Sequence, residues 1–334
     1  MDVLFRADGG PDIGYGHLVR TGALAAELLA RGHDVTYATT TPEAVETTCP
    51  DAVETVSLPA RANPEPCLAH IDRLNPDLVF TDAYPVDTAY QRALREHVPL
   101  AVHQDDARHS VAADLFFNWN LYGPDLDYEF VGPTPRTCLG SDYVPLRASI
   151  RDLATRDPVR RETPTEAVVT MGGSDVAGLT APAVRAFDGT DVRVVAVVGP
   201  GVASDDEATI RTAAEDASAD IEVVRDPPDL PRRLFEAGFA VTTAGSTVYE
   251  LLALGTPFAS RPVVDNQAPI AGALRRREAA TVLDRTDGEA EFREAIVAYL
   301  RDAALRADRQ RRGRTLVDGR GTARVTAELL SLTP

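Results

Sequence analysis

Lysine is missing from this chain of 334 residues, because all 34 of its basic residues are arginine. Acidic residues number 51, so the formal net charge is −17 at pH 7. We interpret this excess of carboxylate as adaptation to concentrated salt, which screens charge, rather than as a surface that repels acidic substrates. Because the sequence has no basic stripe or cluster, nucleic acid is not an expected partner.

Cysteines and long apolar runs are also scarce. Cys49, Cys67 and Cys138 are widely spaced and form no CxxC pair, which argues against a disulfide framework and a cysteine metal site. No apolar run is long enough to span a membrane, and the chain starts with a charged strand rather than a signal peptide. We therefore expect a soluble, cytoplasmic protein that works without a metal or a cofactor.

The first half of the chain alternates short apolar runs with amphipathic stretches, a pattern typical of β-α-β units and a parallel sheet. Strands are predicted at 2–6, 34–39, 52–58, 77–81, 99–103 and 114–117, and helices at 17–31, 42–48, 65–74 and 86–96. A loop-rich passage follows at 118–147, and then a charged stretch at 151–166 that we interpret as a linker.

The alternation restarts beyond this stretch, which predicts a second parallel sheet. Strands are predicted at 167–171, 192–198, 221–224, 239–243, 257–260 and 281–283, and helices at 175–187, 208–217, 229–236, 247–254, 269–277 and 290–301. A final helix at 323–332, with Thr322 as its N-cap, is expected to pack back on the first half. The predicted fold class is α/β, with two Rossmann-like domains at 1–150 and 151–318 facing across a cleft, followed by the C-terminal helix at 319–334.

The first predicted strand-to-helix turn reads IGYGH and carries Gly14, Gly16 and His17. Glycines allow a sharp turn that leaves space for a ligand, and His17 falls on the first turn of the helix. The positive end of the helix dipole disfavours a charged imidazole, so we expect a neutral His17 that can act as a general base. Alternatively, this histidine only contacts solvent. The turn departs from the GxGxxG pattern, so a dinucleotide site is not expected.

A second turn, TTAGSTVYE, leads into a helix that starts at Thr247. The free N–H groups at this helix start, with the hydroxyls of Ser246 and Thr247, form an anion site suited to a diphosphate. Glu250, one turn into the helix, can bind two hydroxyls of a ribose, and Gly245 permits close approach of a ligand. The spacing of Thr247 and Glu250 also fits a capping box, which needs no ligand.

Two further loops of the second half offer glycines or amides. MGGSD supplies Gly172, Gly173 and Ser174 at a predicted helix start, where Ser174 or Asp175 can cap the helix. Asn266 and Gln267 precede another helix and could contact a phosphate or a sugar, although ordinary helix capping explains them as well.

Two loops of the first half offer carboxylates where strands are expected to end. TDAYP carries Asp82 and Tyr84, and HQDD follows the next strand at 103–106. A carboxylate from either loop could orient His17 or bind sugar hydroxyls. Capping of the next helix is an equally good interpretation of each.

Taken in order, these loops resemble the UDP-sugar hydrolases of the pseudaminic acid pathway, which release UDP from a 2,4-diacetamido-2,4,6-trideoxy-altrose nucleotide. That family is related to spore-coat polysaccharide proteins and, more distantly, to the N-acetylglucosaminyltransferase of peptidoglycan lipid synthesis. The matching segments span nearly the whole chain: RAD and IGYGHLVR within 6–20, TDAY at 81–84, LGSDYVPLR at 139–147, MGGSD at 171–175, AGSTVYELLALGTP at 244–257, and NQ and IAGAL within 266–274.

The resemblance implies a GT-B fold in which the second domain holds most of the UDP. It also implies that His17 activates water for attack at the anomeric carbon, that Ser246 and Thr247 hold the diphosphate, and that Glu250 holds the ribose. The other expected substrate contacts are Gly14, Gly16, Arg20, Asp82 and Tyr84 in the first domain, and Gly172, Gly173, Ser174, Gly245, Asn266 and Gln267 in the second.

The chain departs from the family at Gly9, Gly10 and Pro11, where the family has other small residues, and at 148–150, where the family has PEF. The predicted function is inverting hydrolysis of a UDP-linked diacetamido-trideoxy sugar, for nonulosonate or surface glycan synthesis. A glycosyltransferase that uses the same donor site is an alternative, although the sequence shows no clear patch for a lipid acceptor. A nucleotide-sugar-binding protein without catalysis is another, although binding alone needs no base at position 17.

Overall fold

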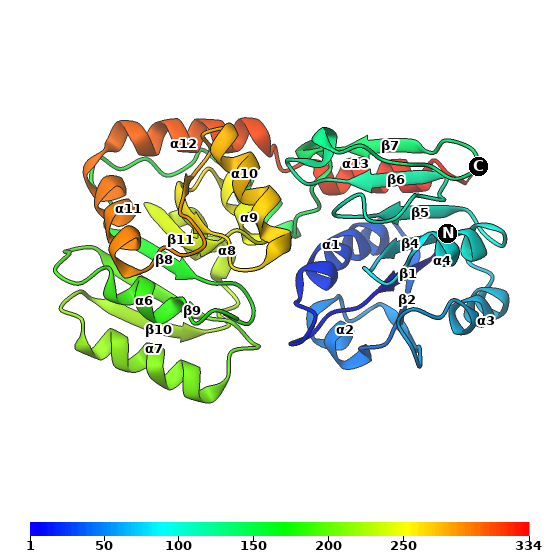
Figure 1. The fold of residues 1–334 in the computed structure, drawn as a ribbon, viewed down its shortest axis with the longest axis horizontal. Helices are drawn as coiled ribbons and strands as arrows, with labels where there is room; N and C mark the ends of the chain where they lie inside the picture. The colour runs from blue at the N-terminus through cyan, green and yellow to red at the C-terminus, as the bar shows by residue number, and fades with distance from the viewer. Residues whose placement is uncertain (334) are drawn as a thin grey trace. The chain divides into compact units, whose positions relative to one another are not determined.

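The computed structural model describes residues 1–333, and the chain divides into two compact units (Figure 1). The first unit holds Met1–Arg147 together with the C-terminal segment from Arg320, and the second holds Ala148–Gly319. Within residues 1–333, no helix is both long enough and apolar enough to cross a membrane.

The first unit is built on a sheet in which every neighbouring pair of strands is parallel, in the order β3-β2-β1-β4-β5-β6-β7. Its strands are β1 (Asp2–Ala7), β2 (Asp34–Thr39), β3 (Glu54–Ser57), β4 (Leu78–Asp82), β5 (Leu100–His103), β6 (Leu115–Asn118) and β7 (Arg136–Leu139). Its helices are α1 (Gly16–Ala30), α2 (Pro42–Thr48), α3 (Glu65–Leu74), α4 (Thr88–Arg95) and α13 (Gly321–Leu330), with short 3₁₀ turns η1 (Gly123–Asp125) and η2 (Ser141–Tyr143).

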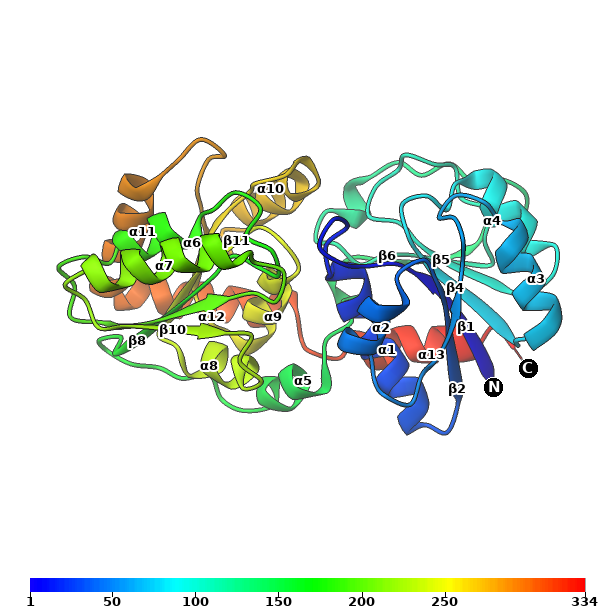
Figure 2. The same cartoon turned by 90° about the horizontal axis from the view of Figure 1, so that it is seen from below.

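Alternation along the strands separates two apolar layers, one on each face of this sheet. Leu4, Val79 and Phe116 point to one face and join the core that α3 and α4 cover. The intervening Phe5 and Phe80 point to the opposite face, where their rings lie 5.3 Å apart. Helices α1, α2 and α13 cover that second face (Figure 2). The sheet is thus buried on both sides, as a parallel sheet requires.

Helix α13 belongs to the first unit and packs against α1. The prediction that Thr322 is its N-cap is wrong, because Arg320 takes that position and Thr322 lies inside the helix. The Thr322 hydroxyl instead donates to the carbonyl of Leu146 at 2.9 Å and accepts from the Leu146 N–H at 2.8 Å. These two hydrogen bonds therefore hold the C-terminal helix against the segment around Leu146, just before the chain leaves the first unit.

The second unit repeats the plan with a parallel sheet in the order β10-β9-β8-β11-β12-β13. Its strands are β8 (Glu166–Thr170), β9 (Arg193–Val198), β10 (Ile221–Arg225), β11 (Phe239–Thr243), β12 (Phe258–Arg261) and β13 (Thr281–Val282). Its helices are α5 (Ala148–Ala154), α6 (Thr180–Arg185), α7 (Ser204–Asp216), α8 (Leu230–Glu236), α9 (Thr247–Leu254), α10 (Ala268–Arg276), α11 (Glu289–Arg301) and α12 (Ala303–Leu316), with the 3₁₀ turn η3 (Asp265–Gln267). Two parallel, Rossmann-like sheets are thus confirmed.

Three elements lie where none was predicted. Strand β7 lies inside the supposed loop, and α5 occupies the start of the supposed linker, where it packs on α8 and α9. Helix α12 was missed because its buried stripe is not apolar: Arg306, Gln310 and Gly313 recur at helical spacing and are the residues that it buries. A Cβ on Gly313 would lie 3.0 Å from the carbonyl oxygen of Leu252, so α12 packs its backbone directly against α9.

Each sheet reverses its strand order at one point, between β1 and β4 in the first unit and between β8 and β11 in the second. In open α/β sheets, ligands bind beyond the carboxyl ends of the strands at such a switch point. The turn that carries His17 follows β1, and Asp82 ends β4. The MGGSD and AGST loops follow β8 and β11. The topology therefore places these four of the six predicted loops at the switch point of their own sheet.

Candidate functional site

The β1–α1 turn has a backbone that only glycine adopts readily. Gly10 and Gly14 have φ angles of 138° and 88°, and they exchange backbone hydrogen bonds of 3.3 and 2.7 Å. A Cβ on Gly9 would lie 2.6 Å from Leu18, so the turn packs tightly on the helix that it starts. This packing fixes where α1 begins, and with it the position of His17 on the first turn.

His17 is oriented by Asp82, which lies 65 residues away in the chain. The distance from His17 Nδ1 to Asp82 Oδ1 is 2.7 Å, and the two side chains are 8% and 1% exposed. Asp82 does not cap the next helix, because Asp87 is the N-cap of α4 and accepts from the Tyr90 N–H at 2.9 Å. Of the interpretations left open for Asp82, orientation of His17 is the one that this contact fits.

Arg20 neutralises the carboxylates of this cluster. Its Nε and Nη2 donate to Asp82 at 2.5 and 2.6 Å, and its Nη1 and Nη2 donate to Asp105 at 3.2 and 3.1 Å. Burial alone would raise the pKa of Asp82, but the guanidinium, aided by His17 and His103, holds that pKa well below its usual range. Both carboxylates are therefore ionised at neutral pH, and Arg20 is engaged with them.

The close contact with Asp82 decides which nitrogen of His17 carries a proton. His17 Nδ1 lies 2.7 Å from Asp82 Oδ1 and 2.9 Å from Arg20 Nη2. A carboxylate oxygen can only accept, and two acceptors do not approach to 2.7 Å without a hydrogen between them, so Nδ1 is the donor to Asp82. In a neutral ring the lone pair consequently resides on Nε2. An imidazole held in this form can accept a proton at Nε2, as a general base must.

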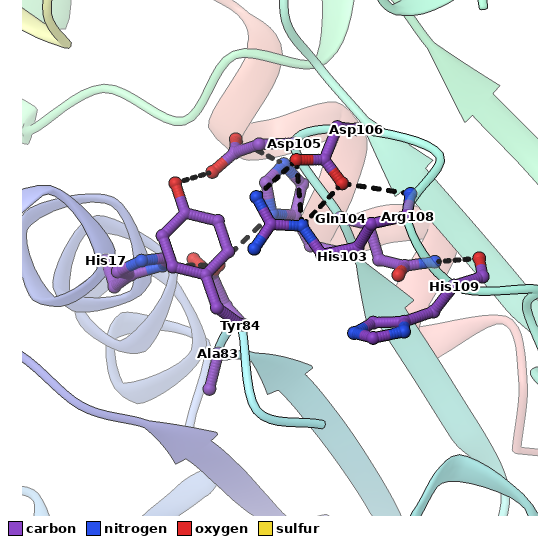
Figure 3. Close-up of a pocket in the computed structure, with 10 residues that line it drawn as sticks. His17, Ala83, Tyr84, His103, Gln104, Asp105, Asp106, Arg108 and His109 are labelled. Atoms are coloured by element: carbon purple, nitrogen blue, oxygen red, sulfur yellow. Dashed lines mark hydrogen bonds and ion pairs between the residues drawn. The ribbon is translucent and has the colours of Figure 1, made fainter. Parts of the chain in front are cut away.

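A small polar pocket adjoins His17 (Figure 3). The Tyr84 ring stands between His17 and Arg108: its centroid is 4.9 Å from the His17 ring and 4.5 Å from the Arg108 guanidinium carbon. Tyr84 also donates to Asp105 at 3.1 Å, and Asp106 pairs with Arg108 through contacts of 2.5 to 2.9 Å. The cavity measures about 10 Å³. That volume is close to the minimum that holds one water molecule.

Several residues of this cluster were not among the predicted site residues. Strand β5 ends in His103, whose pKa is lowered by burial and then by the charge of Arg20. Asn120, just after β6, donates to Asp105 at 2.9 Å. The HQDD motif indicated His103 and Asp105, but the sequence did not show whether either residue contacts His17. Arg108 and Asn120 had no sequence signal, and neither had His109, which also lines the pocket.

In the second unit, the AGST turn leads into α9 as predicted. Ser246 is the N-cap, is exposed, and makes no side-chain capping hydrogen bond. Thr247 already lies inside the helix, so the alternative capping box between Thr247 and Glu250 is not formed. Glu250 is 8% exposed on the first turn. The first N–H groups of α9 are thus not capped by the Ser246 side chain, which suits an anion site.

Gln267 lies against this turn. A Cβ on Gly245 would be 3.6 Å from Gln267 Nε2, and the other end of the amide, Oε1, accepts from the Val263 N–H at 2.9 Å. The Gln267 amide is therefore oriented with its N–H groups toward the AGST turn. Asn266 is exposed beside it in η3. The structure thus brings the NQ loop and the AGST loop together.

The MGGSD loop matches the expectation in one respect and departs from it in another: Asp175 caps the next helix, but that helix begins later than predicted. Helix α6 begins at Thr180 rather than at 175, and Asp175, with φ 40°, accepts from the N–H groups of Leu179 and Thr180 at 2.8 and 2.9 Å. The carboxylate of Asp175 itself therefore occupies the start of α6. Gly172 lies next to β11, since its Cβ would be 4.0 Å from Thr243 Oγ1. Gly172, Gly173 and Ser174 follow β8 at the switch point, and the start of α9 is left as the candidate anion site of this unit.

The predicted residues form two groups, one in each unit. Gly14, Gly16, His17, Arg20, Asp82 and Tyr84 gather at the switch point of the first sheet, and Gly172, Gly173, Ser174, Gly245, Ser246, Thr247, Glu250, Asn266 and Gln267 at that of the second. Among residues 1–333, no group of three or more His, Cys, Asp or Glu side chains is placed to hold a metal ion.

Paired Rossmann-like units with these loops define the GT-B class of folds, and comparison with known structures confirms it. The structure matches that of Acinetobacter baumannii MurG with a TM-score of 0.70 and 16% identity, over 99% of each chain. It matches the glycosyltransferase VinC in complex with dTDP with a TM-score of 0.65 and 16% identity, again over 99% of each chain.

Among curated proteins, the chain is similar to the spore coat polysaccharide biosynthesis protein SpsG of Bacillus subtilis (strain 168). The two are 25% identical over 343 aligned positions, which cover 99% of this chain and 98% of that protein. No protein-family model matches the chain.

Proposed function

We propose that this protein is an enzyme of polysaccharide or nonulosonate biosynthesis that hydrolyses a UDP-linked 2,4-diacetamido-trideoxy sugar to UDP and the free sugar. The GT-B fold supports an enzyme that acts on a nucleotide sugar, and the name of the curated relative supports a role in polysaccharide synthesis. The choice of this sugar, and of UDP over other nucleotides, follows from the family resemblance of the loop motifs.

In the proposed reaction, His17 removes a proton from water as the water oxygen attacks the anomeric carbon. The bond between that carbon and the β-phosphate oxygen of UDP breaks at the same time, and UDP leaves with the electron pair. Attack from the face opposite UDP inverts the anomeric centre. The proton stays on His17 Nε2 until solvent removes it. Asp82 stabilises the charged imidazole through the Nδ1 hydrogen bond of 2.7 Å.

The nucleotide is proposed to bind the second unit. The diphosphate accepts from the first N–H groups of α9 and from the hydroxyls of Ser246 and Thr247, where the helix dipole also stabilises the charge that develops on UDP. Glu250 takes the ribose hydroxyls, and the Gln267 amide contributes a donor beside Gly245. We therefore assign the base to the first unit and stabilisation of the leaving group to the second.

The observation that carries the proposal of hydrolysis is a histidine that a carboxylate orients beside a polar pocket with room for a water molecule. Glycosyl transfer is the second candidate, because VinC, which shares the fold over its whole length, is named a glycosyltransferase. In that case an acceptor hydroxyl replaces the water at His17.

The direct test is UDP release from a panel of UDP-sugars in concentrated potassium chloride, with and without added alcohol or glycolipid acceptors. Hydrolysis predicts UDP and free sugar without an acceptor, with ¹⁸O from labelled water in the sugar and an inverted anomer by NMR. Release that needs an acceptor would establish transfer instead. UDP binding without release under either condition would indicate a binding protein.

Gly245→Ala is expected to weaken UDP binding by about tenfold, roughly 1.4 kcal/mol, without changing the melting temperature. The new Cβ makes only ordinary contacts of 3.6 and 3.8 Å within the protein, so it affects the ligand rather than the fold. Gly272→Ala in α10 is the matched control, because its Cβ would lie 3.4 Å from the flexible Arg276 side chain. Calorimetric titration measures the affinity of both variants for UDP. If Gly245→Ala binds UDP as tightly as the Gly272→Ala control, the diphosphate does not bind at the AGST turn.

A further inference from the structure

His103 lies in the same buried cluster as His17, although the proposed reaction does not use it. Its side chain is 0% exposed, and its ring stacks on Trp119 with centroids 3.8 Å apart. His103 Nδ1 is 3.1 Å from Asp82 Oδ1, the same oxygen that accepts from His17. The two imidazoles therefore share one carboxylate oxygen, from opposite sides of the chain's first switch point: α1 supplies His17 and β5 supplies His103.

His103 Nδ1 has two close neighbours, Asp82 Oδ1 at 3.1 Å and Arg20 Nη2 at 3.3 Å. The carboxylate oxygen is the nearer of the two and can only accept, so we assign the proton to His103 Nδ1, which donates to Asp82. Nε2 of His103 then carries a lone pair. This nitrogen is buried without a hydrogen-bond partner and lies 3.6 Å from Asp105 Oδ1. A ring in this state is neutral, which agrees with the lowered pKa of His103.

We infer that His103 is a positioning residue, which donates to Asp82 and thereby sets how strongly that carboxylate stabilises the charged form of His17. This inference rests on the proposed function for the role of His17 as a base. A carboxylate that accepts an extra hydrogen bond carries less negative charge toward its other partners. Without His103, Asp82 holds the imidazolium of His17 more firmly, and His17 is free to act as a base only at higher pH.

The charged groups around the two histidines are Arg20 from α1, Asp82 from β4 and Asp105 from the loop after β5. Asp106 and Arg108, an ion pair, line the same pocket. The neutral neighbours are Trp119, stacked on His103, and Tyr84, at the edge of His17. Substitution of His103 leaves all of these charges in place and removes one N–H donor. A change in the pH profile can then be assigned to that donor.

The test compares His103→Leu with His103→Asn, two side chains of nearly equal size. Asparagine places its amide nitrogen about where Nδ1 lies and keeps the donor, whereas leucine removes it. We expect His103→Leu to move the acidic limb of the kcat–pH profile up by about one pH unit while KM is unchanged, because the side chain of His103 is fully buried. His103→Asn is expected to restore the profile of the unaltered protein.

A readout without substrate separates this inference from the proposed function. NMR of labelled histidine follows the titration of His17 in the free protein, and its midpoint is expected to rise in His103→Leu but not in His103→Asn. Equal midpoints in all three proteins would overturn the positioning role. Shifted midpoints in a protein that releases no UDP would instead refute the proposed function. If His103→Leu does not fold, His103→Gln, whose amide falls near Nε2 rather than Nδ1, takes its place.

Discussion

His17→Ala is expected to lower kcat for UDP release by about 10²–10⁴-fold, the usual contribution of a general base. The affinity for UDP is expected to remain unchanged, because the proposed nucleotide contacts lie in the second unit. The side chain removed is 8% exposed, and its Nδ1 contacts Asp82 at 2.7 Å and Arg20 at 2.9 Å. Its loss leaves Asp82 paired with Arg20, so the fold keeps its charge balance.

Stopped assays of UDP formation, together with calorimetric titration of UDP, measure both quantities. His97→Ala is the matched control, since His97 is exposed and is not among the residues that line the pocket beside His17. Added imidazole is expected to restore part of the lost rate in His17→Ala but to leave the control unchanged. A kcat within about threefold of the unaltered protein would exclude His17 as the base, because a base contributes at least about 10²-fold.

The fold could be predicted in large part because the local signals agree with the final structure. Helices α2, α3 and α9 have the bounds predicted from periodicity and capping, and β11 does too. Pro42 at the first position of α2 marks its start without any tertiary information. The elements that were missed are those whose burial depends on partners. Helix α12 buries Arg306, which donates to carbonyls of residues 161 and 162, and no periodicity of apolar residues can indicate that contact.

The site was predictable as a set of loops but not as a set of contacts. His17 stood out because a glycine turn rarely needs an imidazole, and Asp82 because it ends a strand. That the two meet depends on β1 and β4 being neighbours, which is a property of strand order and not of local sequence. Asp175 illustrates the opposite case. Its loop reads like that of an anion site, yet its positive φ turns its own carboxylate onto the helix start.

Asp82→Asn is expected to reduce kcat for UDP release by about 10³–10⁴-fold, nearly as much as loss of the base itself. An amide in place of the carboxylate can donate a hydrogen to His17 Nδ1. The ring then carries its proton on Nε2, where it cannot accept one from water. The bond from His17 to Asp82 is 2.7 Å long and buried, so solvent cannot take over this orienting role.

The same substitution is expected to cost about 3–5 kcal/mol of unfolding free energy, because it leaves the buried guanidinium of Arg20 with one carboxylate fewer. The pKa of Asp82 is lowered in the folded protein, so its stabilising effect is present above the pKa of an unfolded Asp and is lost only as the pH falls through the lower folded value. Urea unfolding should therefore show the gap between the two proteins throughout the range from about pH 5 to 8, and it should widen toward pH 5 because Asp82 also stabilises the charged form of His17. A gap that disappears within this range would contradict an ionised Asp82.

Asp87→Asn separates these effects from any general disturbance of the β4–α4 connection. Asp87 caps α4 by accepting from the Tyr90 N–H at 2.9 Å, and asparagine caps helices about equally well. Its kcat and unfolding free energy are expected to match those of the unaltered protein. Unchanged kcat in Asp82→Asn as well would show that Nδ1 of His17 needs no carboxylate to hold its proton, and the assignment of Nε2 as the basic nitrogen would fail with it.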